Sequence, residues 1–232
     1  MQELTDKVVI ITGAKGGLGT FVTKSFLNAG ARVAGVSRSI ADSDFAHPRF
    51  AAFPVELSSA EAANGVLDRA LSTYGRVDAL VHLMGAWAGG SRLEETDAAA
   101  FDRMLDVNLR STFFAFSAAA RVMRSQGAGR LLAIGGKSAM EPQPGAGAYS
   151  VAKAALAMLV RSFAAELRGS GVTANIVLPG TMDTPQNRTA DPTADPSKWV
   201  HPCRVADLLV YLASNAAEAV NGAAIPIYGA DA

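Results

Sequence analysis

Tyr149 and Lys153 are the residues of this chain best suited to proton transfer. They stand four positions apart at the start of an alanine-rich stretch, and residues with that spacing lie on one face of a helix. A positive ammonium group beside a phenol favours the phenolate. Lys153 is therefore expected to move the pKa of Tyr149 from about 10 toward neutrality, where a general acid works best.

A glycine-rich turn near the N-terminus gives this pair a context. Thr12–Gly19 follows an apolar run and precedes a helical pattern, which is where a dinucleotide-binding fold holds pyrophosphate. Gly13 permits the tight turn, Gly17 lets the backbone approach a phosphate, and Gly19 lets the helix pack closely. Further cofactor contacts in this turn are expected at Lys15, Gly16 and Leu18.

The end of the second expected strand selects between two forms of the cofactor. An NAD(H) site places an acid there against the ribose hydroxyls, whereas this chain has Ser37 and Arg38. Together with Lys15, they supply donors and positive charge for a ribose 2′-phosphate. NADP(H) is the preferred cofactor and NAD(H) the possible alternative, and Arg38 as an ordinary solvated charge is the competing interpretation.

The elements that must position these residues alternate along the chain, which predicts a parallel sheet with right-handed crossovers. Strands are expected at Lys7–Thr12, Arg32–Val36, Arg49–Val55, Ala79–Met84, Arg130–Ile134, Val172–Val177 and Ala224–Ile227. Helices are expected at Leu18–Ala29, Ser59–Tyr74, Ala98–Arg124, Tyr149–Arg168 and Val205–Ser214. The prediction is one α/β domain over residues 1–232, a Rossmann-type doubly wound sheet of about seven strands with helices on both faces.

Composition favours a small-molecule ligand. Lys plus Arg and Asp plus Glu are 21 each, so neither nucleic acid nor an anionic membrane is an expected partner. No apolar run was expected to reach the ~18 to 20 residues that span a bilayer. The single cysteine, Cys203, cannot form an intrachain disulfide, and no basic-then-apolar leader precedes Lys7, so a cytoplasmic location is expected.

Five motifs in order resemble the short-chain dehydrogenase/reductase family over nearly the whole chain. They are the turn Thr12–Gly19, Asn108, Tyr149 with Lys153, Pro179-Gly180 with Thr184, and the segment from Gly222 to Gly229. The resemblance implies that Tyr149 is the general acid, that Lys153 also holds the nicotinamide ribose and that Asn108 holds a water of the proton relay. A buried Asn108 that bonds a helix backbone is the alternative. Further cofactor contacts are expected at Glu56, Leu57, Gly85, Thr181 and Met182.

Two departures resemble one branch of that family, the dihydropteridine reductases. The position of the family's substrate-binding serine is Gly136, with Ser138 two residues on as a possible substitute on the same face. The segment from Gly85 to Gly90 contains Trp87, which could stack on a flat heterocycle. The resemblance implies a quinonoid dihydropterin substrate, whose reduction needs less oxyanion stabilisation than a ketone. His82, just before this segment, is expected to be packed rather than catalytic, and no metal site is indicated.

One irregular stretch breaks the rhythm of strands and helices. Residues 184–202 contain four prolines and no periodicity, and such a loop is either disordered or an active-site lid. We expect the part from Pro185 to Trp199 to cover the substrate, with Trp199 as a contact. The alternatives to a pterin reductase are a carbonyl or 3-oxoacyl reductase and a non-catalytic dinucleotide sensor. The small residues of the Tyr149 helix resemble the family's subunit interface, which implies a homodimer or homotetramer; packing inside one subunit is the alternative.

Overall fold

The computed structural model describes residues 4–231 and contains one seven-stranded, wholly parallel sheet in the order β3-β2-β1-β4-β5-β6-β7. The strands are β1 (Val8–Thr12), β2 (Arg32–Ser37), β3 (Phe50–Pro54), β4 (Ala79–His82), β5 (Gly129–Ile134), β6 (Val172–Pro179) and β7 (Ala224–Ile227). The α-helices are α1 (Gly17–Asn28), α2 (Ala60–Tyr74), α3 (Ala98–Leu105), α4 (Ser111–Gln126), α5 (Gly147–Glu166), α6 (Pro185–Ala190) and α7 (Pro202–Ala213).

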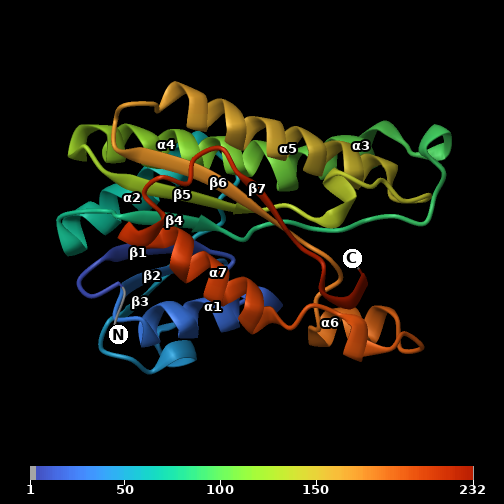
Figure 1. Cartoon of the computed structure of the whole chain (residues 1–232), viewed down its shortest axis with the longest axis horizontal. Coiled ribbons are helices and arrows are strands. Elements are labelled where there is room, and N and C mark those ends of the chain that lie inside the picture. Colours follow the sequence, from blue (N-terminus) through green and yellow to red (C-terminus); the bar gives the residue numbers. More distant parts are fainter. Residues whose placement is uncertain (1–3, 232) are drawn as a thin grey trace.

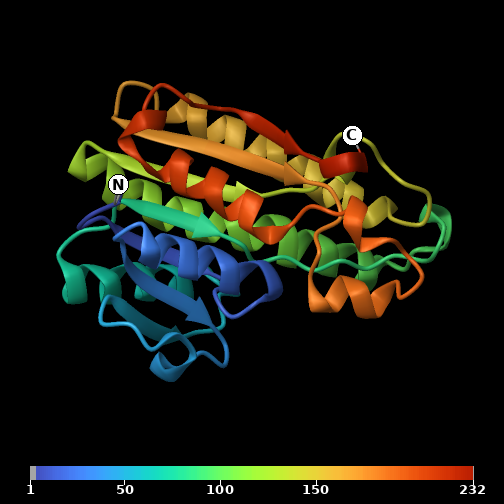
Figure 2. The same cartoon turned by 60° about the horizontal axis from the view of Figure 1, so that its bottom comes forward.

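Helices cover both faces of the sheet, as the sequence predicted. One face packs against α2, α4 and α5, and the other packs against α1 and α7 (Figure 1). The strands are apolar on both sides because both are covered: all five residues of β1 and all eight of β6 are buried. Figure 2, which shows the molecule turned from the view of Figure 1, shows the two helix layers with the sheet between them.

The strand order reverses between β1 and β4, where the chain crosses from one half of the sheet to the other. In such sheets a crevice opens at the carboxyl ends of the strands beside this reversal, and ligands bind in it. The glycine turn follows β1, and the segment that contains Trp87 follows β4. The fold therefore brings together the two ends of the predicted site.

The long helix expected at Ala98–Arg124 is divided in the structure. α3 ends at Leu105, a π-helical turn occupies Asp106–Arg110, and α4 begins at Ser111. The sequence gives no signal for this turn, because its residues keep an ordinary helical pattern. π turns inside helices occur frequently at functional sites, and Asn108 lies in this one.

The stretch from residue 184 to 202 is more ordered than expected. It contains α6, a 3₁₀ turn at Pro196–Lys198 and the first residue of α7. The side chain of Thr184 caps α6 by accepting from the amide of Asn187 at 3.3 Å, with a proline in the first turn. This is the usual start signal of a helix, and the prediction of an irregular segment missed it.

α5 is long and apolar enough to meet the length and composition criteria for crossing a membrane, contrary to expectation. Its buried side chains, including Leu156 and Val160, pack into the core beside the sheet. The apolar face of α5 thus has a partner inside the domain, which accounts for its composition.

Candidate active site

Asn108 and Lys153, which are 45 positions apart in the sequence, meet beside Gly85 just after β4. A Cβ atom on Gly85 would lie 2.9 Å from Oδ1 of Asn108 and 3.2 Å from Nζ of Lys153. No side chain fits between those two groups. A glycine is therefore required where the chain leaves the sheet, and Asn108 and Lys153 come together beside it.

Tyr149 stands in the first turn of α5, half-buried, with its hydroxyl facing the end of β5. Burial raises the pKa of its phenol, and a hydrogen bond with the Ser138 side chain opposes this in part. The direction is opposite to the predicted lowering by Lys153. In the free protein Tyr149 is thus a protonated phenol, which is the form that donates a proton.

The reason for this difference lies in where the Lys153 ammonium points. Nζ donates to the carbonyl oxygen of Ile134 at 3.0 Å and lies 5.6 Å from the centre of the Tyr149 ring. The side chain is 4 % exposed and has no carboxylate partner among the described residues. Burial lowers the pKa of Lys153 to about 8.

The Asn108 side chain is held by backbone atoms. Its Nδ2 donates to the carbonyl oxygens of Ala86 at 2.9 Å and Met104 at 3.1 Å, while Oδ1 accepts from the amide of Ala86 at 3.2 Å. Both amide hydrogens are therefore used, and only a second lone pair of Oδ1 remains toward Gly85. The arrangement matches the alternative interpretation of Asn108 as a backbone-bonded side chain, and it fixes the segment in which Trp87 lies.

Gly136 has the side chains of Tyr149 and Ser138 beside it. A Cβ on Gly136 would lie 3.3 Å from the Tyr149 hydroxyl and 3.5 Å from Oγ of Ser138, so both hydroxyl groups lie beside Gly136. Ser138 lies in a 3₁₀ turn, Lys137–Ala139, two residues along the chain from Gly136.

The glycine turn has the shape that a pyrophosphate requires. Gly13 has φ of +69°, and a Cβ on Gly19 would meet the carbonyl oxygen of Gly13 at 2.0 Å, so a side chain is excluded at Gly19. The first-turn amides of α1 have no partners within the helix, and Gly16 at its N-cap adds no side-chain bond. These amides can hold an anion. The side chain of Leu18, in contrast, is buried in the core.

The basic residues expected to read a 2′-phosphate are both in ion pairs. Nζ of Lys15 lies 2.9 Å from Asp44 and also donates to the carbonyl oxygen of Ser39 at 3.0 Å. Arg38, 79 % exposed, lies 3.9 Å from Glu56. Sequence analysis missed Asp44, whose pKa is lowered mainly by the hydrogen bond from Lys15; its only signal was its place six residues after Arg38.

Two other predicted contacts on this side differ in exposure. Ser37, the last residue of β2, is half-buried. Leu57 is 2 % exposed and belongs to the hydrophobic core between the sheet and α2. The Leu57 side chain therefore packs in the core and does not face a ligand.

The segment from Pro179 to Thr184 approaches the glycine turn from β6. A Cβ on Gly17 would lie 2.6 Å from Oε1 of Gln186 and 3.2 Å from Cβ of Thr184. Gly17 therefore makes room for the start of α6. Gly180, Thr181 and Met182 connect β6 to this contact, and a Cβ on Gly180 would meet the Tyr228 carbonyl oxygen at 2.9 Å.

The base of the predicted lid, where residues 181–183 meet Val200, is held together by backbone hydrogen bonds. Met182 pairs with Val200 as a parallel bridge, with the amide of Val200 donating to Thr181 at 2.8 Å and that of Asp183 donating to Val200 at 2.9 Å. Asp183 and Arg188 form a two-point ion pair within the segment, and the resulting hydrogen bond lowers the pKa of Asp183. Trp199 is half-buried beside this base.

Trp87 lies in the segment that follows β4. It is 66 % exposed, and its ring lies against Gly89, where a Cβ would approach the indole to 2.7 Å. An aromatic face this open to solvent can contact a ligand. The structure therefore places Trp87 after β4, at the carboxyl end of the sheet where the prediction required it.

His82 links the two halves of the site through side chains that sequence analysis did not single out. Its Nδ1 lies 2.9 Å from Oγ1 of Thr12, and its Nε2 lies 3.2 Å from Oγ of Ser111. Ser111 donates to the carbonyl oxygen of Val107 at 2.8 Å, so Nε2 carries the proton and Nδ1 accepts. Burial lowers the pKa of His82 to about 3, which agrees with the expected packed, non-catalytic role.

Comparison with known proteins gives the family directly. The family model described as short chain dehydrogenase matches residues 7–195. The chain is 31 % identical over 244 residues to 2-(R)-hydroxypropyl-CoM dehydrogenase of Xanthobacter autotrophicus, covering 97 % of this chain and 98 % of that protein.

Solved structures share the whole fold. The structure of ElxO with NADP bound superposes with a TM-score of 0.91 at 23 % identity, covering 97 % of this chain and 98 % of the other. The 3-ketoacyl-(acyl-carrier-protein) reductase of Brucella melitensis complexed with NADH gives 0.89 at 24 %, covering 98 % and 99 %. In the part of the chain that the structure describes, no three His, Cys, Asp or Glu residues are grouped to hold a metal.

Proposed function

The chain belongs to the short chain dehydrogenase family, and from this premise we propose that it is an NADPH-dependent reductase of a carbonyl compound. The observation that carries the proposal is that the hydroxyl groups of Tyr149 and Ser138 both lie beside Gly136, just after β5. NADPH, when bound, supplies the hydride to the carbonyl carbon. Tyr149 donates its proton to the carbonyl oxygen, Ser138 donates a hydrogen bond to that oxygen, and the product is an alcohol.

The printed names of two similar proteins support the same bond chemistry. One is a dehydrogenase of a hydroxypropyl compound and the other a 3-ketoacyl reductase. Both names describe interconversion of a carbonyl and an alcohol. Tyr149 and Ser138 are the two donors to the carbonyl oxygen in this proposal. Ser138 lies two residues after Gly136, where the family has its serine, but its hydroxyl still lies beside Gly136.

Ser138→Ala tests this proposal. The variant should reduce a simple ketone about 10- to 100-fold more slowly in kcat/KM, because one donor to the developing oxyanion is lost. Adding Gly136→Ser should restore part of the rate, since a Cβ at that position lies 3.3 Å from the Tyr149 hydroxyl. Unchanged ketone reduction by Ser138→Ala would refute the role of Ser138.

The choice of NADPH over NADH is supported by Lys15, Ser37 and Arg38 at the ribose end of the crevice. A 2′-phosphate would compete with Asp44 and Glu56 for the two basic side chains, and its double charge favours it. Arg38→Asp should reverse the preference in kcat/KM, with Arg32→Asp, at an exposed position of β2, as the charge-matched control. Comparable kcat/KM for both cofactors before mutation would contradict the proposal.

A quinonoid dihydropterin is the second candidate substrate, and the open Trp87 ring favours it. A flat ring stacked there would gain about 0.5–1.5 kcal/mol beyond area burial. Trp87→Ala should raise KM for the pterin more than it lowers kcat, while KM for a small ketone changes little. Faster reduction of the ketone than of the pterin by the unmodified protein would decide against this candidate.

The segment from Pro185 to Trp199 is proposed as the substrate lid. The bridge between Met182 and Val200 joins the two ends of this segment, so the segment can move as one unit. Gln186 lies beside Gly17, which places the segment over the glycine turn. A cytoplasmic location and assembly as a homodimer or homotetramer are further parts of the proposal. Exposed apolar side chains on α4 and α5, Phe113, Val151 and Met158, support the assembly; sedimentation measures it.

A further inference from the structure

A second hollow opens at the amino ends of β5 and β6, at the opposite end of the sheet from Tyr149. Its volume is about 540 Å³. Its walls come from the chain reversals that precede these strands and from the turn that follows α7. A Cβ on Gly171 would meet the Gly127 carbonyl oxygen at 2.0 Å, so two of these reversals approach closely only because that residue is glycine.

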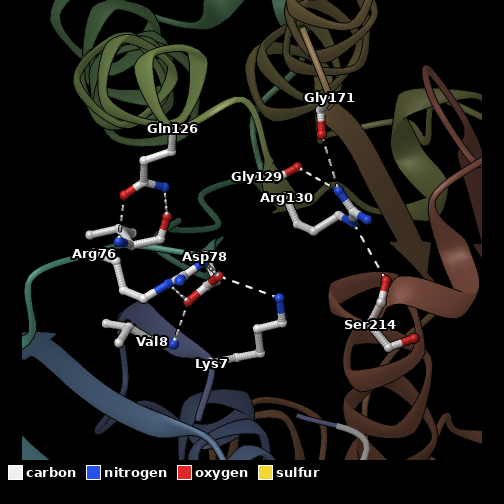
Figure 3. Close-up of polar contacts among 10 residues, drawn as sticks. Lys7, Val8, Arg76, Asp78, Gln126, Gly129, Arg130, Gly171 and Ser214 are labelled. Atoms are coloured by element: carbon white, nitrogen blue, oxygen red, sulfur yellow. Dashed lines mark hydrogen bonds and ion pairs between the residues drawn. The ribbon is translucent and has the colours of Figure 1, made fainter. Parts of the chain in front are cut away.

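Arg130 at the floor of this hollow carries a buried charge without a carboxylate in contact. The residue is 9 % exposed. Its Nη1 donates to the carbonyl oxygens of Gly129 at 3.0 Å and Gly171 at 3.4 Å, and its Nε donates to that of Ser214 at 3.5 Å (Figure 3). Within the described residues its Nη2 has no hydrogen-bond acceptor, so two strong donors remain available.

The carboxylate of Asp78, at the same end of the sheet, is fully used by other groups. Asp78 accepts from Arg76 at 2.7 and 3.0 Å, from the amide of Val8 at 2.9 Å and from Lys7 at 3.5 Å. Figure 3 shows this cluster beside Arg130, with no link between them. Two cations share one carboxylate, so the charge of Arg130 adds to a local excess of positive charge.

Thr173 gives the second, independent sign of a missing partner. It is the register partner of Arg130 on the neighbouring strand, lines the same hollow and is 6 % exposed. Its hydroxyl makes no hydrogen bond in the described structure. A buried polar group without a partner costs free energy, so native proteins rarely leave one.

The remaining charges of the hollow lie on its rim. Arg168 and Glu218 are both exposed, and Glu218 forms no ion pair with Arg130 within 4 Å. Burial lowers the pKa of Arg130 from its ordinary value, and the charges of Glu218 and Asp78 oppose this only in part. The floor of the hollow therefore remains a place where an anion is favoured.

We propose that this hollow binds a small oxyanion, a carboxylate or phosphate group of a small molecule, between Arg130, Arg168 and the Thr173 hydroxyl. The anion accepts from Nη2 of Arg130, and the Thr173 hydroxyl turns to donate to it. This site is separate from the pyrophosphate-binding turn, which follows the carboxyl end of β1.

Thermal unfolding of the protein saturated with NADPH tests the proposal, because the active-site phosphate positions are then filled. Potassium phosphate and potassium citrate are titrated separately against potassium chloride at constant ionic strength. The midpoint should rise and saturate with one or both anions. The stronger arm identifies the tetrahedral or the planar oxyanion, and no saturable rise in either overturns the proposal.

Variants on the rim assign the effect to this hollow without disturbing its floor. Arg168→Gln should weaken the apparent Kd about tenfold, whereas Arg161→Gln, exposed on α5 outside the hollow, should leave it unchanged. Glu218→Gln should tighten binding, because a like charge is removed. Equal binding by Arg168→Gln and the unmodified protein, or weaker binding by Glu218→Gln, would overturn it.

Discussion

The two ends of the parallel sheet treat their charged side chains differently. At the amino end, Asp78 is surrounded by Lys7, Arg76 and the amide of Val8. At the carboxyl end, the buried charge of Lys153 is held by the carbonyl oxygen of Ile134, and the amide of Asn108 is held by other backbone atoms. One end pairs charges with charges, and the other holds polar groups with the backbone.

This difference separates stability from chemistry. Asp78 is already neutralised by two cations, so its charge attracts a ligand only weakly. Removing its ion pairs, however, weakens the fold. A cation held only by a carbonyl oxygen keeps its charge for whatever enters the crevice, and its burial shifts its pKa. Arg130 is the exception at the amino end, which is why it carries the inference of a second site.

The largest expected effect is at the carboxyl end. Tyr149→Phe removes the proton donor and should lower kcat by ~10²–10⁴-fold while the Kd for NADPH changes little. Tyr211→Phe, exposed on α7, is the matched control and should retain full activity. Steady-state kinetics with a fluorescence titration of NADPH measure both quantities, and a fully active Tyr149→Phe would place the chemistry elsewhere.

Lys153 predicts a change of stability with pH. Its pKa is about 8 in the folded protein and 10.5 in an ordinary setting, so between these values the unfolded chain binds one more proton. The free energy of unfolding should therefore rise with pH across that window, by about 3 kcal/mol for this group. Urea unfolding at pH 8 and pH 10 measures it.

Lys153→Met supplies the control for that experiment. It removes the titrating group, so its stability should gain less between pH 8 and pH 10 than that of the unmodified protein. The affinity for NADPH should also fall above pH 8 in the unmodified protein, because the ammonium loses its charge. Identical pH profiles for the two proteins would show that Lys153 keeps an ordinary pKa.

At the amino end, Asp78→Asn should lower the free energy of unfolding by about 1–3 kcal/mol. Its kcat/KM should stay unchanged, because the residue lies at the far end of the sheet from Tyr149. Asp68→Asn, exposed on α2, is the control and should change neither quantity. A loss of activity without loss of stability would remove the distinction between the two ends.

The smallest expected effect concerns His82, whose charge we expect not to change with pH. Because burial holds the pKa of His82 at about 3, the residue stays neutral, and its imidazole NMR signals should not titrate between pH 5 and 8. A midpoint near 6.5 for His82 would mean that its bonds to Thr12 and Ser111 are open in solution.

Much of the architecture was predictable because it depends on local pattern. The seven expected strands correspond to the observed ones within a few residues at each end, since buried parallel strands are written as short apolar runs. Gly13 and Gly19 were predictable for a related reason. A tight turn and a close helix contact exclude side chains whatever the surroundings.

Other features depended on which atoms the fold brings together, and no sequence spacing encodes them. The sequence placed Lys153 one turn from Tyr149, but only the packed structure directs its ammonium at Ile134 and buries it, which reverses the expected pKa shift of the phenol. It supplied Ser138 as an alternative, and the turn after β5 brings the hydroxyls of Ser138 and Tyr149 to the same side of Gly136. The residues themselves come from the sequence, whereas desolvation and hydrogen-bond direction arise only when distant segments exclude water together.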